Sequence, residues 1–298
     1  MSVFNRMIES EEKNKILPST LYLIATPIGN LADLSARAYK TLAGVDFIAA
    51  EDTRSAQRLL SYFELPPKEC VSYFEHNKKE KGSYILSRLL RGESCALITD
   101  AGTPAVSDPG EDIVRLCAEN GVAVTAVPGA CAAINALSLS ALSTRKFVFE
   151  GFLSANAGER RRRLDTLRFE ERTLIFYEAP HKLRATLSDL LAAFGNRRIA
   201  LCREMTKLNE EIMRVTIEEA VRYYEENAPR GEYVLVIEGA DPSLRPKAEE
   251  GSLFASLSCE EHVAHYEAQG LSRMDAIKAA ARDLGISKSE LYRKLHQE

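Results

Sequence analysis

The chain has 298 residues, 45% of them hydrophobic, which suffices for a substantial core and favours roughly two compact domains plus an appendage. Its 39 Lys and Arg against 43 Asp and Glu give a formal net charge of −4. This excludes a generic nucleic-acid coat, whose binding depends on phosphate neutralisation, but a local basic patch remains compatible with RNA binding. Six scattered cysteines without a C-x-x-C pair are typical of buried thiols in a reducing cytoplasm.

Neither a leader nor a membrane helix is expected. Residues 1–20 are rich in charge and lack the apolar run of a signal peptide. The most apolar stretch, residues 121–142, is interrupted by Pro128, Gly129 and Asn135, so it does not form one continuous membrane helix. We therefore expect a cytoplasmic protein without membrane association.

Short apolar runs alternate with helical patterns over residues 20–131. The runs are LYLIAT, VDFIAA, SCALIT and VAVTAVP, at 21–26, 45–50, 94–99 and 122–128. Helical periodicity marks the segments at 34–43, 53–64, 78–91 and 110–120. This alternation favours a mainly parallel sheet with helices on both faces and a ligand crevice beyond the carboxyl ends of its strands.

A second series of the same kind occupies residues 132–240. Its strands are predicted at 146–152, 172–178, 198–204 and 231–239, and its helices near 158–170, 181–194 and 217–226. Residues 1–19 precede the first domain as an extension. We therefore predict the α/β class, with two α/β domains and a ligand cleft between them.

The remaining residues predict a linker and a small helical piece. Residues 241–255 are rich in Pro, Gly, Ser and charge. Within residues 256–298 an alanine-rich helix ends at Gly285, and Ser287 with Glu290 forms a capping-box pattern that starts another helix. This pattern resembles a helix-turn-helix, but any helical hairpin shares it, so nucleic-acid contact and plain packing or partner docking both stay open.

The segment DAGTPAVSDPG, residues 100–110, follows a buried strand and opens a helix, where a ligand loop is expected. Gly102 permits close approach of the backbone to a ligand, and Thr103 and Ser107 supply hydroxyl groups. Asp100 places a carboxylate at the strand end, where it could meet an amine, a ribose hydroxyl or a cation.

The end of this segment has a structural interpretation. Asp108, Pro109 and Glu111 fit the N-cap, N1 and N3 positions of the next helix. Asp108 is therefore interpreted mainly as a cap, and residues 100–106 as the part that faces the ligand.

The first strand ends in TPIGN, residues 26–30, at the place where a dinucleotide enzyme carries G-x-G-x-x-G. Only one glycine is present there, and no G-x-x-x-x-G-K-[ST] occurs in the chain. NAD(P) and ATP chemistry therefore lose most of their support.

Glu51, Asp52 and Arg54 follow the second strand, at the strand end where catalytic groups collect. They form either an acid–base cluster for proton transfer or a local structure in which Asp52 caps the next helix and Glu51 pairs with Arg54. His76 precedes a lysine-rich helix and is either a base, a phosphate contact or an exposed bystander.

Four consecutive arginines, Arg160, Arg161, Arg162 and Arg163, lie on a predicted helix and form the strongest RNA-like feature of the chain. Guanidinium forks suit phosphate groups. Consecutive residues point around a helix, so only some could meet one ligand, and a solvated helix face is the alternative.

Metal binding has little support in the sequence. His262 and His265 share a helical face, but no cysteine or carboxylate pair completes a ligand set around them. We expect no metal site.

Taken together, the chain resembles the tetrapyrrole-methylase-fold family of S-adenosylmethionine methyltransferases, and within it the ribosomal RNA small subunit methyltransferase I branch. The resemblance covers residues 21–239 through nine segments in the family's order and spacing. They are YLIATPIGNLADLS, AAEDTR, ITDAGTPAVSDPG, VPGACAAINALSLSAL, FEGFL, ERRRRL, FYEAPHKL, CREMTK and GEYVLVIEG. The segment DAIKAAARDLGISKSELY is similar to the tail of many members of that branch.

The resemblance implies a homodimer that binds S-adenosylmethionine between its two α/β domains. Its implied reaction is methylation of the ribose 2′-hydroxyl of a decoding-centre cytidine in 16S ribosomal RNA, with small-subunit RNA or the 30S particle as partner. Members of the family lack the glycine fingerprint, in agreement with TPIGN. The implied cofactor site comprises Ile28, Asp100, Gly102, Thr103, Val106, Cys131, Ala132, Tyr177 and Met205.

The substrate side follows less directly from the resemblance. The catalytic candidates are Glu51, Asp52, Arg54 and His76, and the candidates for RNA phosphate contacts are Arg54, Arg160, Arg161, Arg162 and Arg163. The alternatives are a methyltransferase of the same fold acting on a tetrapyrrole or other small substrate, and a non-catalytic ribosome assembly factor. Two positions depart from the family pattern: Cys131 replaces a small hydroxyl residue, and Val215 replaces a glycine.

Overall fold

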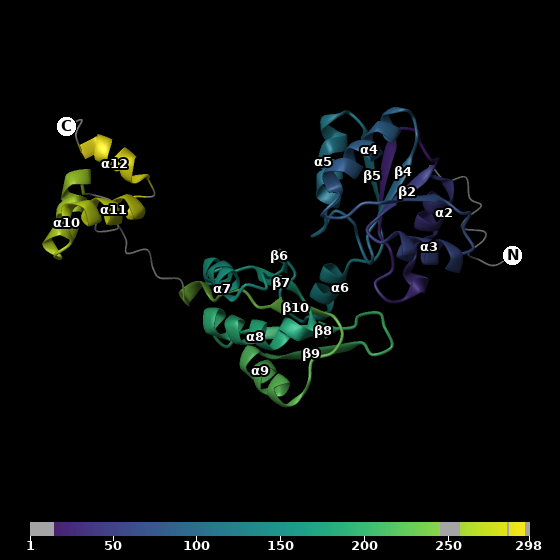
Figure 1. Cartoon of the computed structure of the whole chain (residues 1–298). Coiled ribbons are helices and arrows are strands. Elements are labelled where there is room, and N and C mark those ends of the chain that lie inside the picture. The colour runs from purple at the N-terminus through teal and green to yellow at the C-terminus, as the bar shows by residue number, and fades with distance from the viewer. Residues whose placement is uncertain (1–14, 245–256, 285, 296–298) are drawn as a thin grey trace. The chain divides into compact units, whose positions relative to one another are not determined.

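Figure 1 shows the computed structural model of the chain, which describes residues 15–244, 257–284 and 286–295. The chain divides into two compact units, Met1–Ala240 and Asp241–Glu298, and each is described by itself. Most of the predicted extension and of the predicted linker lies outside the described residues. Within the described part of the chain, no helix is both long and apolar enough to cross a bilayer.

The first unit contains two five-stranded sheets, and Figure 1 labels β2, β4 and β5 of the first of them. This sheet is parallel throughout, with the strand order β3-β2-β4-β1-β5. Strands β2 and β4 are buried along their whole length, as expected when helices cover both faces. The strands are β1 (Thr20–Ile24), β2 (Phe47–Ala50), β3 (Glu69–Ser72), β4 (Cys95–Ile98) and β5 (Ala123–Val127). The connecting helices are η1 (Leu31–Asp33), α2 (Ala36–Gly44), α3 (Thr53–Tyr62), α4 (Lys78–Leu90) and α5 (Gly110–Glu119).

Two hydrophobic cores form on the two faces of this sheet, because successive residues of a strand point to opposite sides. Ile48 of β2 packs in one cluster with Leu60 of α3. Its neighbour Phe47 packs in the other with Ile85 of α4 and Ile113 of α5. With both faces covered, the carboxyl ends of the strands remain the edge where loops can bind a ligand.

The second sheet has the order β6-β7-β10-β8-β9 and is mixed. Only β6 and β7 are parallel; β10 is antiparallel to β7 and β8, and β8 is antiparallel to β9. The strands are β6 (Phe147–Phe152), β7 (Thr173–Glu178), β8 (Arg198–Arg203), β9 (Glu211–Thr216) and β10 (Tyr233–Ile237). The helices are α6 (Ala132–Leu139), α7 (Ala157–Thr166), α8 (Pro180–Phe194) and α9 (Ile217–Glu226).

The α/β class is confirmed, but the prediction of a mainly parallel arrangement is wrong for the second sheet. The sequence patterns predict neither β9 nor β3, because both are edge strands whose residues are mostly half-exposed and lack a continuous apolar run. Once β9 follows β8 through a short loop, the pair forms an antiparallel hairpin, whereas a parallel pair needs a long crossover. Helix α6 is also unpredicted. It begins at Ala132, in the apolar stretch after Pro128 and Gly129, where the sequence patterns define a strand at 122–128 but no helix.

The second unit is a three-helix cluster of α10 (Cys259–Ala268), α11 (Arg273–Asp283) and α12 (Lys288–Leu295). Its core is formed by small and branched apolar side chains from all three helices, including Val263, Ala280 and Leu291. The Ser287 hydroxyl oxygen accepts from the Glu290 amide at 3.2 Å, as the capping pattern predicts, while Gly285 lies outside the described residues. The sequence patterns define two of these helices, and α10 precedes them.

His262 of α10 is buried in this unit, and its Nε2 lies 3.3 Å from Asp283 Oδ2. The histidine therefore packs against α11. Among the described residues, no group of three or more His, Cys, Asp or Glu side chains is arranged to hold a metal ion.

A buried ion pair joins α7 to α8, two helices that accompany the second sheet. Arg160 and Asp189 are 6% and 7% exposed, and Arg160 Nη2 lies 2.6 Å from Asp189 Oδ2. Arg161 Nε donates to the other carboxylate oxygen at 2.9 Å. Burial would raise the pKa of Asp189, but hydrogen bonds from Arg161 and Arg160 outweigh it and hold the pKa below its ordinary value.

The substitution Asp189→Asn is expected to lower the free energy of unfolding by about 3 kcal/mol at pH 7, because it leaves Arg160 buried without its counter-charge. A carboxyl whose folded-state pKa is depressed stabilises the fold above its unfolded pKa, and this contribution is lost as pH falls through the folded value. The melting temperature of the wild type should therefore fall below about pH 5. This part of the pH dependence should be absent in the variant, and thermal unfolding across pH measures both.

The matched control is Asp165→Asn, which removes an exposed carboxylate from α7. It should leave both the stability at pH 7 and its pH dependence close to wild type. Equal effects of the two substitutions would contradict a stabilising role for the buried pair.

Candidate functional site

A cavity of about 450 Å³ is lined by loops that follow β1, β4 and β5 and by residues at the ends of β6, β7, β8 and β10. Cavities of about 300–1,000 Å³ are typical of small-molecule sites. The structure brings all nine residues of the implied cofactor site to the lining of this one cavity: Ile28, Asp100, Gly102, Thr103, Val106, Cys131, Ala132, Tyr177 and Met205.

Two loops of the first sheet are tied together by backbone hydrogen bonds at this cavity. The Thr26 amide donates to the Gly102 carbonyl at 2.9 Å, and the Gly102 amide donates to the Thr26 carbonyl at 3.0 Å. Gly102 has a φ of +84°, and a Cβ at this position would lie 3.3 Å from Ile28 Cγ2. Glycine is thus favoured both by the left-handed backbone and by the close approach of the first loop.

The loop between Asp100 and α5 is strained and held by one carboxylate. Ala105 and Ser107 have φ values of +64° and +65°, which L-residues rarely adopt. Asp108 Oδ1 accepts from the Ala105 amide at 3.0 Å and from the Gly110 amide at 2.7 Å. Asp108 therefore caps the start of α5 as interpreted, although the helix begins one residue later than the sequence pattern predicts.

The wall from the second sheet is aromatic and apolar. The Tyr177 hydroxyl oxygen accepts from the Ala133 amide at 3.2 Å, and the rings of Phe149 and Phe152 meet Tyr177 edge-on. Burial, and secondarily Cys131, raise the pKa of Tyr177 to about 12, so it stays a neutral phenol at physiological pH.

The two departures from the family pattern fall at different kinds of position. Cys131 is the N-cap of α6, and its side chain makes no capping hydrogen bond, so the exchange removes the cap that a hydroxyl would supply. Val215 pairs with Ile199 within the regular ladder of β8 and β9.

The sequence interpretation missed several charged residues of the same cavity. Glu204 and Lys207 follow β8, and the Lys207 ammonium lies 2.9 Å from Glu204 Oε1 and 3.0 Å from Glu232 Oε2. A hydrogen bond from the Glu232 amide, together with Lys207, lowers the pKa of Glu204. The sequence does contain a pattern that indicates them, because an acidic and a basic residue of the segment CREMTK follow a strand end. The cofactor site implied by the resemblance includes only Met205 of this segment.

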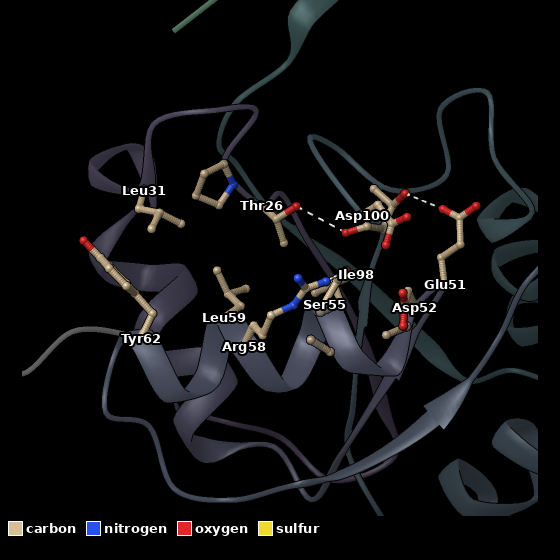
Figure 2. Close-up of a pocket in the computed structure, with 14 residues that line it drawn as sticks. Thr26, Leu31, Glu51, Asp52, Ser55, Arg58, Leu59, Tyr62, Ile98 and Asp100 are labelled. Carbon is tan, nitrogen blue, oxygen red and sulfur yellow. Dashed lines mark hydrogen bonds between the residues drawn. The ribbon is translucent and has the colours of Figure 1, made fainter. Parts of the chain in front are cut away.

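A second cavity of about 330 Å³ adjoins the first (Figure 2). Glu51, Thr99 and Asp100 line both cavities and so form their common edge. The Thr99 hydroxyl donates to Glu51 Oε2 at 3.0 Å, which orients that carboxylate. Asp100 has no hydrogen-bond or ion-pair partner within the described part of the chain, so its carboxylate is available to a ligand.

Asp52 caps α3, as the structural alternative predicts, but it is also Asp52 that pairs with Arg54. Asp52 Oδ1 accepts from the Arg54 amide at 2.8 Å, and Asp52 Oδ2 lies 3.0 Å from Arg54 Nη2. The pairing of Glu51 with Arg54, which belongs to the structural alternative, does not form. The side-chain hydrogen bond from Arg54 holds the pKa of Asp52 below its ordinary value, which makes it a weaker base than a free carboxylate.

His76 is not brought to either of these two cavities. Its ring meets Phe74 edge-on, with centroids 6.1 Å apart, ahead of α4. Of the four catalytic candidates, Glu51 and Asp52 therefore line these two cavities, and His76 and Arg54 do not. Arg54 is exposed and paired with Asp52.

The arginine run divides according to its position around α7. Arg160 is buried with Asp189, and Arg163 Nε donates to Glu150 at 2.7 Å. The prediction that Arg160 contacts RNA phosphates is corrected, because its guanidinium is enclosed and already paired. Arg161 and Arg162 are exposed, and Arg162 has no partner among the described residues.

The comparisons with known proteins agree with this geometry. The family model described as Tetrapyrrole (Corrin/Porphyrin) Methylases matches residues 20–221. The chain belongs to the tetrapyrrole methylase family. A protein of Halalkalibacterium halodurans named ribosomal RNA small subunit methyltransferase I is 46% identical over 94% of this chain and 95% of its own. Proteins of that name from Synechocystis and Bacillus subtilis are 44% and 43% identical, over 91% and 93% of this chain and 95% and 94% of their own.

Solved structures share the tetrapyrrole methylase fold. A cobalt precorrin-4 methyltransferase superposes with a TM-score of 0.56 at 16% identity, covering 74% of this chain and 95% of its own. A uroporphyrin-III C-methyltransferase from Thermus thermophilus, complexed with S-adenosyl homocysteine, gives 0.51 at 19% identity, covering 74% and 97%. These neighbours establish the fold alone.

Proposed function

We propose that this methylase transfers the methyl group of S-adenosylmethionine to the ribose 2′-hydroxyl of a cytidine in the decoding region of 16S ribosomal RNA. The relatives named ribosomal RNA small subunit methyltransferase I support the class of substrate. The observation that carries the chemistry is the common edge of Glu51, Thr99 and Asp100, where two cavities meet with a free carboxylate and an oriented one.

The larger cavity has the properties that the cofactor requires. It is large enough for a ligand of that size, Gly102 keeps one wall free of a side chain, and Asp100 offers an unpartnered carboxylate to a hydroxyl or amine. Tyr177 and Met205 supply an apolar wall. When bound, S-adenosylmethionine supplies an electrophilic methyl group on a cationic sulfonium.

The residues of the chain contribute positioning and a proton acceptor. Methyl transfer to a hydroxyl needs the oxygen aligned behind the methyl carbon, so holding the two ligands at one edge is the main requirement. Glu51, oriented by Thr99, is placed to accept the ribose proton. Asp52 is already engaged with Arg54 and caps α3, so we assign it a structural role.

The proposal includes a homodimer in the cytoplasm and RNA contacts outside the cavities. Arg162 is exposed on α7 without a partner among the described residues, so it is free to approach a phosphate from the surface. Arg161 is also exposed, but its Nε is engaged with Asp189. The three-helix unit adds a further candidate surface for nucleic acid or a partner protein.

The test is transfer of labelled methyl from S-adenosylmethionine to 30S particles purified from cells that lack this protein, followed by mapping of the labelled nucleotide. We expect label on one ribose 2′-oxygen of a decoding-region cytidine. Label on a base would contradict the 2′-O assignment. Absence of label, with transfer to a tetrapyrrole acceptor instead, would favour the activity of the fold neighbours named above.

The proton-acceptor assignment predicts different effects at two adjacent carboxylates. Glu51→Gln should lower the single-turnover rate of methyl transfer by about 10²- to 10⁴-fold, the usual contribution of a positioned base. Asp52→Asn should lower it much less. Affinity for S-adenosylhomocysteine, measured by calorimetry, should stay near wild type in both variants. If both keep the wild-type rate, Glu51 is not the proton acceptor.

The glycine at the cavity wall predicts a selective effect on cofactor binding. Gly102→Ala and Gly92→Ala both place a side chain on left-handed backbone, with φ values of +84° and +99°, so each should destabilise the fold by about 1–2 kcal/mol. Only the Cβ of residue 102 presses on Ile28, since a Cβ at 92 meets nothing within 4 Å. Titration with S-adenosylhomocysteine should show weakened binding for Gly102→Ala alone; equal affinities would contradict the site.

A further inference from the structure

We propose that the 330 Å³ cavity of Figure 2, here called the acceptor pocket, holds one nucleotide that has left the stack of its RNA strand, with its base on Tyr62 and its ribose at the Glu51–Asp100 edge. This inference rests on the proposed function and assigns the place of its substrate. The pocket is lined by Thr26, Pro27, Leu31, Ala50, Glu51, Asp52, Ser55, Ala56, Arg58, Leu59, Tyr62, Ile98, Thr99 and Asp100.

One face of α3 builds a wall of the acceptor pocket. Ser55, Arg58, Leu59 and Tyr62 stand at positions i, i+3, i+4 and i+7 of this helix, which is the spacing that places side chains on one side. Helix α3 starts directly after Glu51 and Asp52, at the end of β2. It therefore runs from the common edge to Tyr62, at the opposite end of the acceptor pocket.

The two ends of the acceptor pocket differ in character. Figure 2 shows Leu31 and Tyr62 at one end, and Glu51 and Asp100 at the other, with Arg58 between them. The acidic end accepts a neutral hydroxyl donor and repels a phosphate, because like charges at short range are unfavourable. A nucleotide therefore fits with its ribose hydroxyl at the acidic end and its base at the aromatic end.

Tyr62 is the stacking partner in this arrangement. Its side chain is 63% exposed although it lies at a pocket wall, and the Phe63 ring meets it edge-on with centroids 5.0 Å apart. Leu31, 37% exposed, is also part of this end. An exposed ring beside an aliphatic side chain is what proteins use to hold an unpaired base, since every base offers a π face.

Arg58 supplies the positive charge of the acceptor pocket. Its Nη2 donates to the Ser55 hydroxyl at 3.2 Å, and no carboxylate pairs with it within the described residues. One turn earlier, Arg54 is held by Asp52. Arg58, which lies between the two ends of the pocket in Figure 2, is thus free to bind the phosphate that flanks the bound nucleotide.

The size of the acceptor pocket favours a single nucleotide. At about 330 Å³ it lies at the lower limit of ligand cavities, and four linked pyrrole rings are much larger than one base. A base within a stacked helix cannot reach a pocket of this kind, so the target nucleotide has to leave the stack before its ribose meets the common edge.

The test compares Tyr62→Ala, Tyr62→Phe, Arg58→Gln and Arg58→Lys in methyl transfer to 30S particles, with affinity for S-adenosylmethionine measured in parallel. We expect Tyr62→Ala to lower kcat/KM for the particle about ten- to hundredfold, mainly through KM, and Tyr62→Phe to restore it. Arg58→Gln should weaken the reaction and Arg58→Lys should recover part of it. Cofactor affinity should not change. Tyr84→Ala, which removes a 43% exposed tyrosine from α4, is the matched control and should keep wild-type kinetics.

A direct binding measurement separates this inference from the proposed function. Cytidine 5′-monophosphate, with S-adenosylhomocysteine present, should give a saturation-transfer NMR signal with the wild type that is lost in Tyr62→Ala and kept in Tyr84→Ala. This result supports the acceptor pocket even if no 30S methylation is found. Wild-type kcat/KM in both Tyr62→Ala and Arg58→Gln would overturn it while leaving the methyltransferase proposal intact, as would nucleotide binding that does not depend on Tyr62.

Discussion

The pair of backbone hydrogen bonds between Thr26 and Gly102 is the constraint on which the site depends. In a parallel sheet the loops after successive strands leave from one edge, but nothing in the sheet itself fixes them to one another. The Thr26–Gly102 bridge joins the loop after β1 to the loop after β4, so that Ile28 and Asp100 line the same cavity. The absence of a side chain at residue 102 is what permits this close contact.

Local structure separates the acidic residues near this bridge into those that cap helices and those that face the cavities. Asp108 and Asp52 lie at the starts of α5 and α3, where each satisfies backbone amides, and Asp52 is also neutralised by Arg54. Asp100 and Glu51 are left at the edge between the two cavities. Four residues with left-handed backbone, Ala105, Ser107, Glu204 and Thr206, lie in the loops around the larger cavity, consistent with strain concentrated at a functional site.

Sequence patterns predict most of this fold because the buried strands of the first sheet are continuous apolar runs between amphipathic helices. They fail for β3 and β9, where edge exposure removes the apolar signal, and therefore for the mixed topology of the second sheet. In the site, residue types indicate the cavity but not the partners of each charge. Arg54 binds Asp52 instead of Glu51 because of the local geometry at the start of α3, and Arg160 turns inward to Asp189 through a tertiary contact between α7 and α8. Tyr62 and Arg58 belong to no recognisable motif, because a helix face of mixed polarity is common on protein surfaces. Their place in a cavity depends on Leu31 of η1, which the fold brings to the same lining.

The central claim is that methyl transfer takes place across the edge formed by Glu51, Thr99 and Asp100. A crystal structure with S-adenosylhomocysteine and a short cytidine-containing RNA strand tests it most directly. We predict the cofactor product in the larger cavity, one nucleotide in the acceptor pocket, and its 2′-oxygen facing the sulfur across that edge, within hydrogen-bond distance of Glu51. A nucleotide bound on α7 or elsewhere, with its ribose remote from Glu51 and Asp100, would contradict the claim.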